Sequence, residues 1–420
     1  MKNRLIGFIP TMLLGTALSL LSLPAMAAGI NVLANLTGTA TGANSYAGLL
    51  DVNGILYGTA ANGGTNGDGS VFSYNLSTGS INQIVAFNGT NGHFPVAGLT
   101  DINGTLYGAT QSGGAYGGGV IYSLNPSNGT MTNLVNFNGG GNNGAAPSMR
   151  MNDIGGLLYG TTTTGGANGV GTLFSFNPGT NGLATLANFS TSTTGGNPYD
   201  APIDINGVLY GTTSNGGKYQ EGAIFSYNMS TGVLADISNF NTATGTGPLN
   251  RVSYINGNLY GTTQFGGANG EGTVYSFNLA TGQLLAMMSF VGPNGDTSYS
   301  GLLNVSNMLY GVTAYGGANN DGTLFAVDPA TGGSVTLASF SGSNGIYPNS
   351  APIDIGGVLY SDTSKGGSVG DGIVYSYTAP TTQQLAQDIP EPSSFACLAI
   401  GVGILGLMYS FFIKKKNVTN

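Results

Sequence analysis

The feature that most constrains the fold is a repeat of about fifty residues. The dipeptide Leu-Tyr recurs seven times, at intervals of 50 to 52 residues. The unit tyrosines are Tyr57, Tyr107, Tyr159, Tyr210, Tyr260, Tyr310 and Tyr360. A chain built from copies of one small unit buries the apolar face of each copy against its neighbours. The fold is therefore a stack or a ring of seven units.

Each unit reads as four β-strands. In DVNGILYG (51–58), Asn-Gly separates two apolar runs and predicts a hairpin, because both turn residues need positive φ. Strands such as SVFSY (70–74) and INQIVAF (81–87) complete the unit, and nothing between residues 29 and 389 reads as a helix. Repeated four-stranded units of this length indicate a β-propeller.

The two ends of the repeat region predict how the ring closes. The last unit stops after IVYSYTAP (373–380) and lacks a fourth strand, whereas INVLANL (30–36) precedes the first unit without a partner. This segment shares LAN, in register, with the fourth strand LATLANF (183–189). We therefore expect an all-β, seven-bladed propeller over residues 29–380 whose N-terminal strand completes the last blade and removes the exposed edges.

The loop GGTNGDG (63–69) and its six equivalents join the second and third strands. Such glycine-rich loops could cradle a phosphate, but a phosphate cradle opens a helix and none follows here. A calcium β-roll repeats every nine residues rather than every fifty. These loops therefore most simply connect strands. Their acidic residues are either solvated turn residues or a weak cation-binding rim for calcium, and the sequence leaves both open. The residues of that rim would be Asp68, Glu221, Glu271, Asp321 and Asp371.

The unit tyrosines allow two interpretations. Aromatic rings stack on sugars, but a residue at the same strand position in every blade usually packs between blades. We therefore expect the unit tyrosines in the core.

The segments outside the repeat carry export signals. Residues 1–28 read as a signal peptide, with basic Lys2 and Arg4, an apolar stretch and an Ala25-x-Ala27 ending; a retained membrane anchor is the alternative. Residues 395–413 contain no charge and three lysines follow, which predicts a transmembrane helix with a cytoplasmic C-terminus. Residues 381–389 would be a linker.

The C-terminal segment 390–420 also resembles a known signal. Pro390-Glu391-Pro392, an apolar span and a basic cluster follow one another as in the PEP-CTERM sorting signal of Gram-negative bacteria. The resemblance implies recognition by an exosortase-type sorting protease and passage from the inner membrane to the cell surface or extracellular matrix, commonly in bacteria that make extracellular polysaccharide. A plain tail anchor is the alternative.

The repeat itself resembles the Gloeo-Verruco tandem-repeat family. The shared wording is LYGTT followed by GG-x-NG-x-GT-x-FS, across residues 30–380, and it departs at Ser361, where the other units have glycine. The resemblance implies a fold and an exported location. It implies no reaction.

Composition limits the partners. Residues 29–389 hold four basic and sixteen acidic side chains, a net charge of −12, which disfavours binding to nucleic acid or to anionic membranes. The only cysteine, Cys397, lies in the apolar tail. Disulfides and cysteine metal sites are therefore excluded from the exported region.

Catalysis has few candidate residues. His93 is the only histidine, and we expect it in a solvated loop. Paired carboxylates could serve a glycosidase, but aspartates before turns commonly bond to nearby backbone. These aspartates are Asp51, Asp101, Asp153, Asp204 and Asp354. Two functions stay open. One is a non-catalytic surface or matrix module that needs no cofactor and contacts polysaccharide or surface proteins. The other is a propeller glycoside hydrolase or lyase that acts on extracellular polysaccharide.

Two arginines interrupt the repeat. Nine residues before the unit tyrosine most units carry glycine or alanine, but the third and fifth carry Arg150 and Arg251. If the first strand is innermost, both guanidinium groups reach the central channel. They would bind a carboxylate, as in an acidic sugar; a salt bridge to a neighbouring aspartate such as Asp153 is the alternative.

Overall fold

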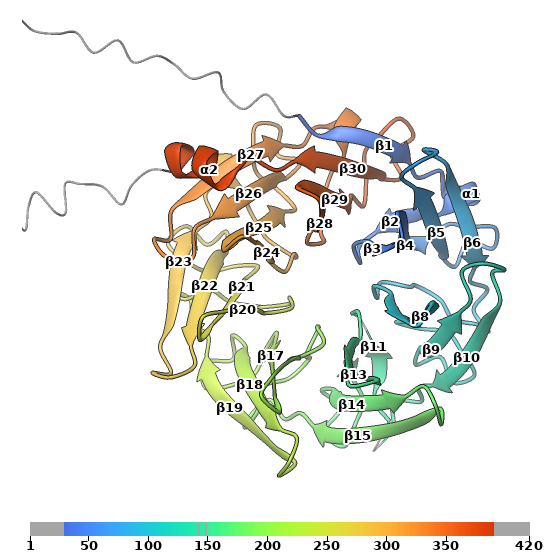
Figure 1. Ribbon diagram of the computed structural model, residues 1–420. Coiled ribbons are helices and arrows are strands. Elements are labelled where there is room, and N and C mark those ends of the chain that lie inside the picture. The colour runs from blue at the N-terminus through green and yellow to red at the C-terminus, as the bar shows by residue number, and fades with distance from the viewer. Residues whose placement is uncertain (1–28, 141–142, 148, 390–420) are drawn as a thin grey trace, which may run out of the picture.

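The computed structural model describes residues 29–389 except 141–142 and 148, and it forms seven antiparallel sheets around a central channel (Figure 1). This confirms the predicted seven-bladed propeller. The predicted signal peptide, the Pro390–Pro392 motif and the apolar span 395–413 lie outside the described residues. No helix within the described residues is long and apolar enough to cross a membrane.

The blades follow the order of the repeats, and each sheet runs from a three-residue innermost strand to an outermost strand. The first blade is β2 (Ala43–Ser45), β3 (Leu50–Val52), β4 (Ile55–Asn62), β5 (Ser70–Asn75) and β6 (Ile81–Ala86). The second is β7 (Thr100–Ile102), β8 (Thr105–Thr110), β9 (Val120–Leu124) and β10 (Met131–Asn136). The third is β11 (Ala145–Pro147), β12 (Asn152–Ile154), β13 (Leu157–Thr164), β14 (Thr172–Asn177) and β15 (Gly182–Asn188). The fourth is β16 (Ile203–Ile205), β17 (Val208–Thr213), β18 (Ala223–Asn228) and β19 (Val233–Asn239).

The remaining blades have the same plan. The fifth is β20 (Ser253–Ile255), β21 (Asn258–Thr262), β22 (Thr273–Asn278) and β23 (Leu284–Ser289). The sixth is β24 (Leu303–Val305), β25 (Met308–Thr313), β26 (Thr323–Val327) and β27 (Ser334–Ser339). The seventh is β28 (Ile353–Ile355), β29 (Val358–Asp362), β30 (Ile373–Thr378) and the N-terminal β1 (Asn31–Asn35). Short helical turns α1 (Gly38–Thr41), η1 (Gly292–Asn294) and η2 (Gly342–Asn344) lie between blades.

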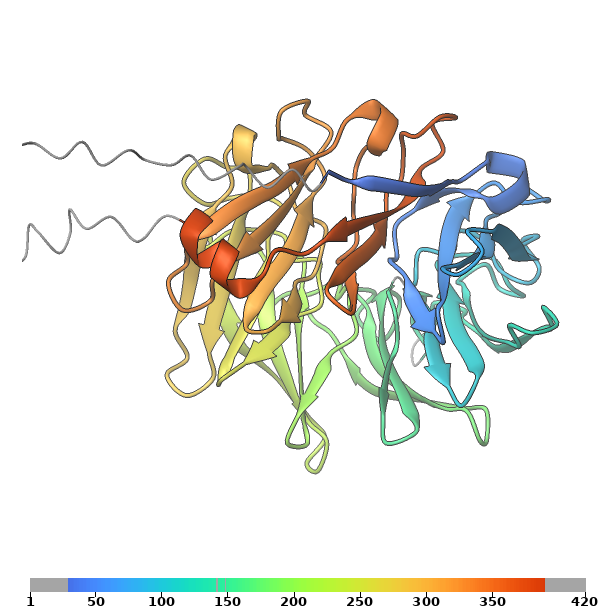
Figure 2. The same cartoon turned by 45° about the horizontal axis from the view of Figure 1, so that its top comes forward.

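The ring closes through β1, as the sequence predicts. This strand pairs antiparallel with β30 and lies beside it in both views (Figure 1 and Figure 2). The amide of Leu36 then donates to the carbonyl of Gly372 at 2.9 Å, and the Leu36 side chain is fully buried. The outermost strand of the last blade is therefore held by strand pairing, by packing and by side-chain hydrogen bonds of Asn31 and Asn35.

Local geometry explains why the same sequence motif recurs in each unit. At the first hairpin Asn53 and Gly54 have φ of 54° and 80°, the left-handed conformation that the Asn-Gly turn needs. One strand further, Gly58 pairs with Phe72, and a Cβ atom on Gly58 would lie 2.3 Å from the Phe72 ring. Glycine after the unit tyrosine therefore leaves room for an aromatic ring from the third strand. The same contact recurs at Gly108, Gly160, Gly211, Gly261 and Gly311.

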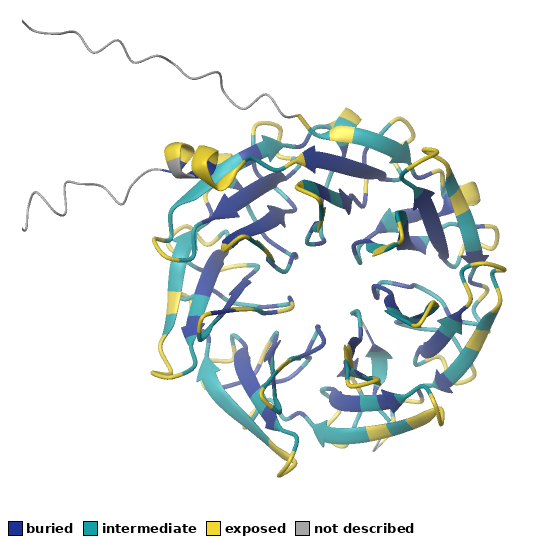
Figure 3. Ribbon diagram, viewed as in Figure 1, coloured by how far each residue is buried: buried dark blue, intermediate teal, exposed yellow. Residues whose placement is uncertain are grey.

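Aromatic pairs join each blade to the next. Phe87, at the end of one blade's fourth strand, meets Tyr122 of the next blade edge to face, with ring centroids 5.3 Å apart. Five further junctions repeat this pair, and at the closing junction Leu36 packs near Phe72 instead. The unit tyrosines pack against core clusters too, as predicted, for example Tyr57 against the cluster that holds Leu106. Three of them are buried (Tyr57, Tyr260 and Tyr310), and the other four are half-buried. Figure 3 shows the middle strands buried and the outermost strands half-buried.

The expectation that nothing between residues 29 and 389 is helical is wrong at the short turns α1, η1 and η2, and at the end of this range. In place of a linker, the segment forms α2 (Thr382–Asp388), which Thr381 caps by accepting a hydrogen bond from the Gln384 amide. Leu385 and Ile389 of this segment are buried against the core of the last two blades. The Thr-x-x-Gln capping pattern is the sequence signal that identifies this helix.

Candidate functional site: the central channel

The central channel holds two adjoining cavities. The residues just before each innermost strand line them, together with loops from one face of the propeller. We call the cavity on that face, of about 480 Å³, the mouth, and the adjoining cavity along the innermost strands, of about 550 Å³, the waist. Tyr46, Met149, Tyr299 and Asn349 line both cavities, which makes them parts of one space. Both volumes are in the range of small-molecule binding sites.

The two arginines line the waist from the third and fifth blades. Arg150 is half-buried and Arg251 is exposed to the cavity. In the part of the chain that the structure describes, neither guanidinium group makes a hydrogen bond or an ion pair. Glycines leave room beside both arginines. A Cβ atom on Gly98 would lie 3.2 Å from Arg150 Cβ, and one on Gly301 would lie 3.1 Å from the Arg251 carbonyl oxygen.

Asp200 of the fourth blade lies between the two arginines in the ring order. It is 8% exposed, and Oδ1 accepts a hydrogen bond from the Ala201 amide at 2.6 Å. Burial raises the pKa of Asp200 to about 6, against the lowering effects of Arg251, of the backbone amides of Ala201 and Arg251, and of Arg150. The carboxylate is thus satisfied mainly by backbone donors.

The arginines repel one another. Burial, and then the positive charge of Arg251, lower the pKa of Arg150 to about 10, with Asp200 acting in the opposite direction. Asp153, the alternative partner, does not line the waist. Its Oδ1 instead accepts a hydrogen bond from the Gly156 amide at 2.8 Å, within a turn. Two cationic groups therefore face one cavity with a single carboxylate between them.

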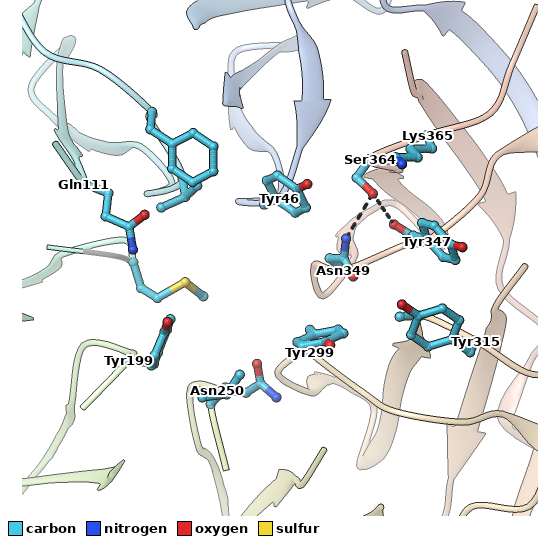
Figure 4. Close-up of a pocket in the computed structure, with 15 residues that line it drawn as sticks. Tyr46, Gln111, Tyr199, Asn250, Tyr299, Tyr315, Tyr347, Asn349, Ser364 and Lys365 are labelled. Carbon is cyan, nitrogen blue, oxygen red and sulfur yellow. Dashed lines mark hydrogen bonds between the residues drawn. The ribbon is translucent and has the colours of Figure 1, made fainter. Parts of the chain in front are cut away.

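Aromatic side chains surround the mouth (Figure 4). Tyr46, Tyr199 and Tyr299 stand eleven residues before their unit tyrosines, at equivalent positions of the first, fourth and sixth blades. Beside them the rings of Tyr315 and Tyr347 meet edge to face at 4.9 Å.

Lys365 adds a charge to this aromatic mouth. Its Nζ lies 5.9 Å from the centre of the Tyr347 ring. Our sequence reasoning considered only the unit tyrosines and missed this second set, although its recurrence in three units could have revealed it.

The charges of residues 29–389 are distributed unevenly. Of the four basic side chains of residues 29–389, three line the cavities: Arg150, Arg251 and Lys365. Of the sixteen acidic ones, only Asp200 lines them among the described residues. The central channel is therefore positively charged although residues 29–389 as a whole carry a net negative charge.

The acidic loop residues that could form a cation-binding rim remain separate. Glu271 Oε2 accepts from the Gly292 amide at 2.6 Å, and Asp371 Oδ2 accepts from the Gly38 amide at 2.8 Å, each across a blade junction. No three carboxylate, histidine or cysteine side chains lie close enough to hold a metal ion in the described ranges. The geometry gives two of these residues a role in joining blades.

The other candidates for catalysis have local roles. Asp51 Oδ1 accepts from the Gly54 amide at 2.9 Å, and Asp101, Asp204 and Asp354 make the same bond, as predicted for aspartates before turns. His93 lies on the rim, with Nδ1 2.8 Å from Ser112 Oγ and Nε2 3.7 Å from Asp68 Oδ1. Its side chain is 42% exposed, and it lines neither cavity.

Comparison with known proteins identifies the repeat. The family described as the Gloeobacter/Verrucomicrobia repeat matches residues 19–213 and 190–375. The chain belongs to this family. A search of curated proteins finds no match.

Two solved structures share the family member's fold. One is the extracellular domain of a hybrid two-component system protein from B. thetaiotaomicron, with 14% identity and a TM-score of 0.57; the match covers 84% of this chain and 40% of that one. The other is an oligogalacturonate lyase from Vibrio parahaemolyticus, with 11% identity and a TM-score of 0.55, covering 84% of this chain and 94% of that one. The chain thus spans less than half of the first structure, and at these identities both show the fold alone.

Proposed function

We propose that this family member is an exported, non-catalytic propeller of the bacterial surface or extracellular matrix that binds an acidic saccharide in its central channel. The PEP-CTERM-like tail supports sorting by an exosortase-type protease. The repeat architecture supports a role as an interaction module, and no cofactor is needed for that role.

The observation that carries the proposal is the cationic lining. Three of the four cations of an acidic molecule face one cavity with a single carboxylate, so the channel favours an anion while the outer surface repels it. Guanidinium groups present planar donors that fit a carboxylate, and here they lack protein partners within the described residues. A uronic acid offers that carboxylate together with the hydroxyl groups of a sugar.

Binding of oligogalacturonate to the full chain in detergent, measured by titration calorimetry, tests the proposal. We expect binding that weakens with salt and that is lost when Arg150 and Arg251 are both replaced by alanine. Lys218→Ala removes an exposed cation outside both cavities and should leave binding unchanged. Equal losses in the double variant and in the control would show that net charge alone attracts the ligand.

Sorting has its own test. Mass spectrometry of surface or secreted material should find the protein processed near Pro390–Pro392. Recovery of surface protein that still contains residues 395–413 would contradict the proposed processing.

A lyase is the second candidate, since one feature of the waist favours it. Elimination from a uronic acid needs cations at the carboxylate and a base, and Asp200, with a pKa of about 6, lies between two arginines. Backbone amides occupy that carboxylate, which favours the binding role. Unsaturated products, followed by ultraviolet absorbance during the same titration, would establish the lyase instead.

A further inference from the structure

We infer that the saccharide enters the channel by one chain end, with its terminal acidic sugar at the waist and the preceding sugar rings against the tyrosines of the mouth. This inference rests on the proposed function and specifies its ligand. It also assigns a second part of the site, the mouth, to sugar rings rather than to charge.

The closed ring dictates the direction of entry. Seven sheets surround the axis, and β1 pairs with β30 at the junction where the chain would otherwise leave an edge. Because no side of the ring is open, a polymer reaches Arg150 and Arg251 only along the axis. A chain end can enter along the axis without bending, and this favours entry by the end.

The mouth offers the chemistry of a sugar-ring site. Tyr46, Tyr199 and Tyr299 are half-buried, so each ring is fixed by packing while part of it stays open to the cavity. Tyrosine combines an apolar ring face with a polar hydroxyl, which suits a pyranose that has C–H faces and hydroxyl edges.

An unpaired amide oxygen adds a specific contact. Asn250 lines the mouth and is 2% exposed; its Nδ2 donates to Thr262 Oγ1 at 2.8 Å. Because Thr262 Oγ1 donates in turn to the Ser300 carbonyl at 2.7 Å, it must accept from Asn250, and this fixes the orientation of the amide. Asn250 Oδ1 then has no hydrogen-bond partner among the described residues. Buried acceptors are rarely left so. Because the oxygen is covered in this structure, a sugar hydroxyl would reach it only after neighbouring side chains of the mouth shift.

An acidic peptide fits less well. One common way to bind an extended peptide is to add it as a strand to a sheet edge. The innermost strands that face this channel, such as β16 and β20, are only three residues long. The rings and the amide of the mouth therefore favour a saccharide.

The experiment compares galacturonic acid with its dimer and trimer, titrated into the full chain in detergent. We expect affinity to rise with length up to the trimer. Tyr199→Ala changes a ring that lines the mouth and not the waist, so it should weaken the trimer by about two- to tenfold and leave the monomer unchanged. Tyr116→Ala, which removes a ring that is 69% exposed and outside both cavities, is the matched control and should change nothing.

A polymer arm tests entry by the end. Long polygalacturonate should compete with the labelled trimer in proportion to its concentration of chain ends, not of sugar residues. Competition in proportion to sugar residues would overturn end entry, and equal affinity for monomer and trimer would overturn the mouth site. In both cases binding itself would leave the proposed function standing.

Two other outcomes are equally clear. If none of the galacturonates binds the wild-type chain, the proposed function fails first and the inference fails with it. If tri-glutamate binds as tightly as the trimer and responds equally to Tyr199→Ala, the mouth recognises acidic chains in general and the choice of a saccharide is wrong.

Discussion

Asp362 is a buried acid at the closing junction, and replacing it should stabilise the propeller at neutral pH. It is fully buried, and its carboxylate accepts hydrogen bonds from Ser45 Oγ at 2.7 Å and Ser350 Oγ at 3.0 Å. Burial raises the pKa of Asp362 to about 6, although the two serine hydroxyls act to lower it. Four of the other blades carry threonine at this position: Thr59, Thr161, Thr212 and Thr262.

The magnitude follows from the two pKa values. The acid has an ordinary pKa of 3.8 in the unfolded chain and one of about 6 in the folded protein, a difference of about two units or roughly 3 kcal/mol. Because the folded pKa is raised, this stability is fully present below about pH 4 and is lost as pH rises through about 6. At about pH 8 wild-type Asp362 therefore lowers the free energy of unfolding by roughly 3 kcal/mol relative to acidic solution.

Asp362→Thr should remove this pH dependence without orphaning a neighbour. Ser45 Oγ keeps a bond to the Thr59 carbonyl at 2.8 Å, and Ser350 Oγ keeps its contact with Ser361 Oγ at 3.0 Å. A threonine hydroxyl can also donate to the next blade, as Thr262 does to Ser300.

Urea unfolding of wild type and variant at about pH 4 and about pH 8 measures the effect. The variant should gain roughly 3 kcal/mol more at the higher pH than at the lower. Asp51→Asn is the matched control, because Asn304 makes the equivalent turn bond in the sixth blade at 3.1 Å. A gain that is the same at both pH values, or a variant that is less stable than wild type at about pH 8, would refute the reasoning.

Three further outcomes are expected. Tyr122→Phe and Tyr275→Phe should leave the melting temperature unchanged or raise it, because these buried hydroxyls, whose pKa burial raises, lack partners among the described residues and other blades carry phenylalanine there; a clear loss would reveal a missed partner. Deleting residues 30–36 should lower the melting temperature markedly, since it exposes the edge of β30 and removes the buried Leu36; an unchanged temperature would mean that β1 is dispensable for closure. Binding of trigalacturonate should strengthen as pH falls from about 8 to about 5, because protonation of Asp200, with its pKa of about 6, removes the only acidic charge found in the described lining; Asp200→Asn should abolish this change, and its persistence in that variant would assign it to another group.

The architecture could be predicted from the sequence because the information is local and repeated. Asn53-Gly54 specifies a hairpin through its own backbone. The seventh unit lacks a fourth strand, and this gap predicts that residues 30–36 supply it. The α2 helix was missed because seven residues give a weak periodic signal. Its stability depends on Leu385 and Ile389 meeting the last blades, which only the folded ring brings near.

The site was predictable only in part. The repeat places Arg150 and Arg251 before an innermost strand, so their position in the channel follows from strand order. The mouth depends on which residues of seven separate units converge, and no single unit reveals that Tyr46, Tyr199 and Tyr299 share one cavity. The pairing of Asn250 with Thr262 likewise requires side-chain geometry, because residue order does not say which amide atom stays unbonded.

Departures from a uniform repeat fall into two groups that differ in how well their polar atoms are satisfied. At the closing junction, the carboxylate oxygens of Asp362 have serine partners on both sides, although burial of this acid lowers stability at neutral pH. In the channel, the guanidinium groups of Arg150 and Arg251 have no partner within the described residues, and Asn250 Oδ1 is buried and unpaired. Such groups cost stability, because an unpaired buried acceptor costs about 1–3 kcal/mol and two facing cations repel. A role outside folding accounts for both costs at once, for example binding of a ligand that brings the missing acceptors and donors. This role predicts that bound oligogalacturonate raises the melting temperature of the wild type but not that of the double arginine variant.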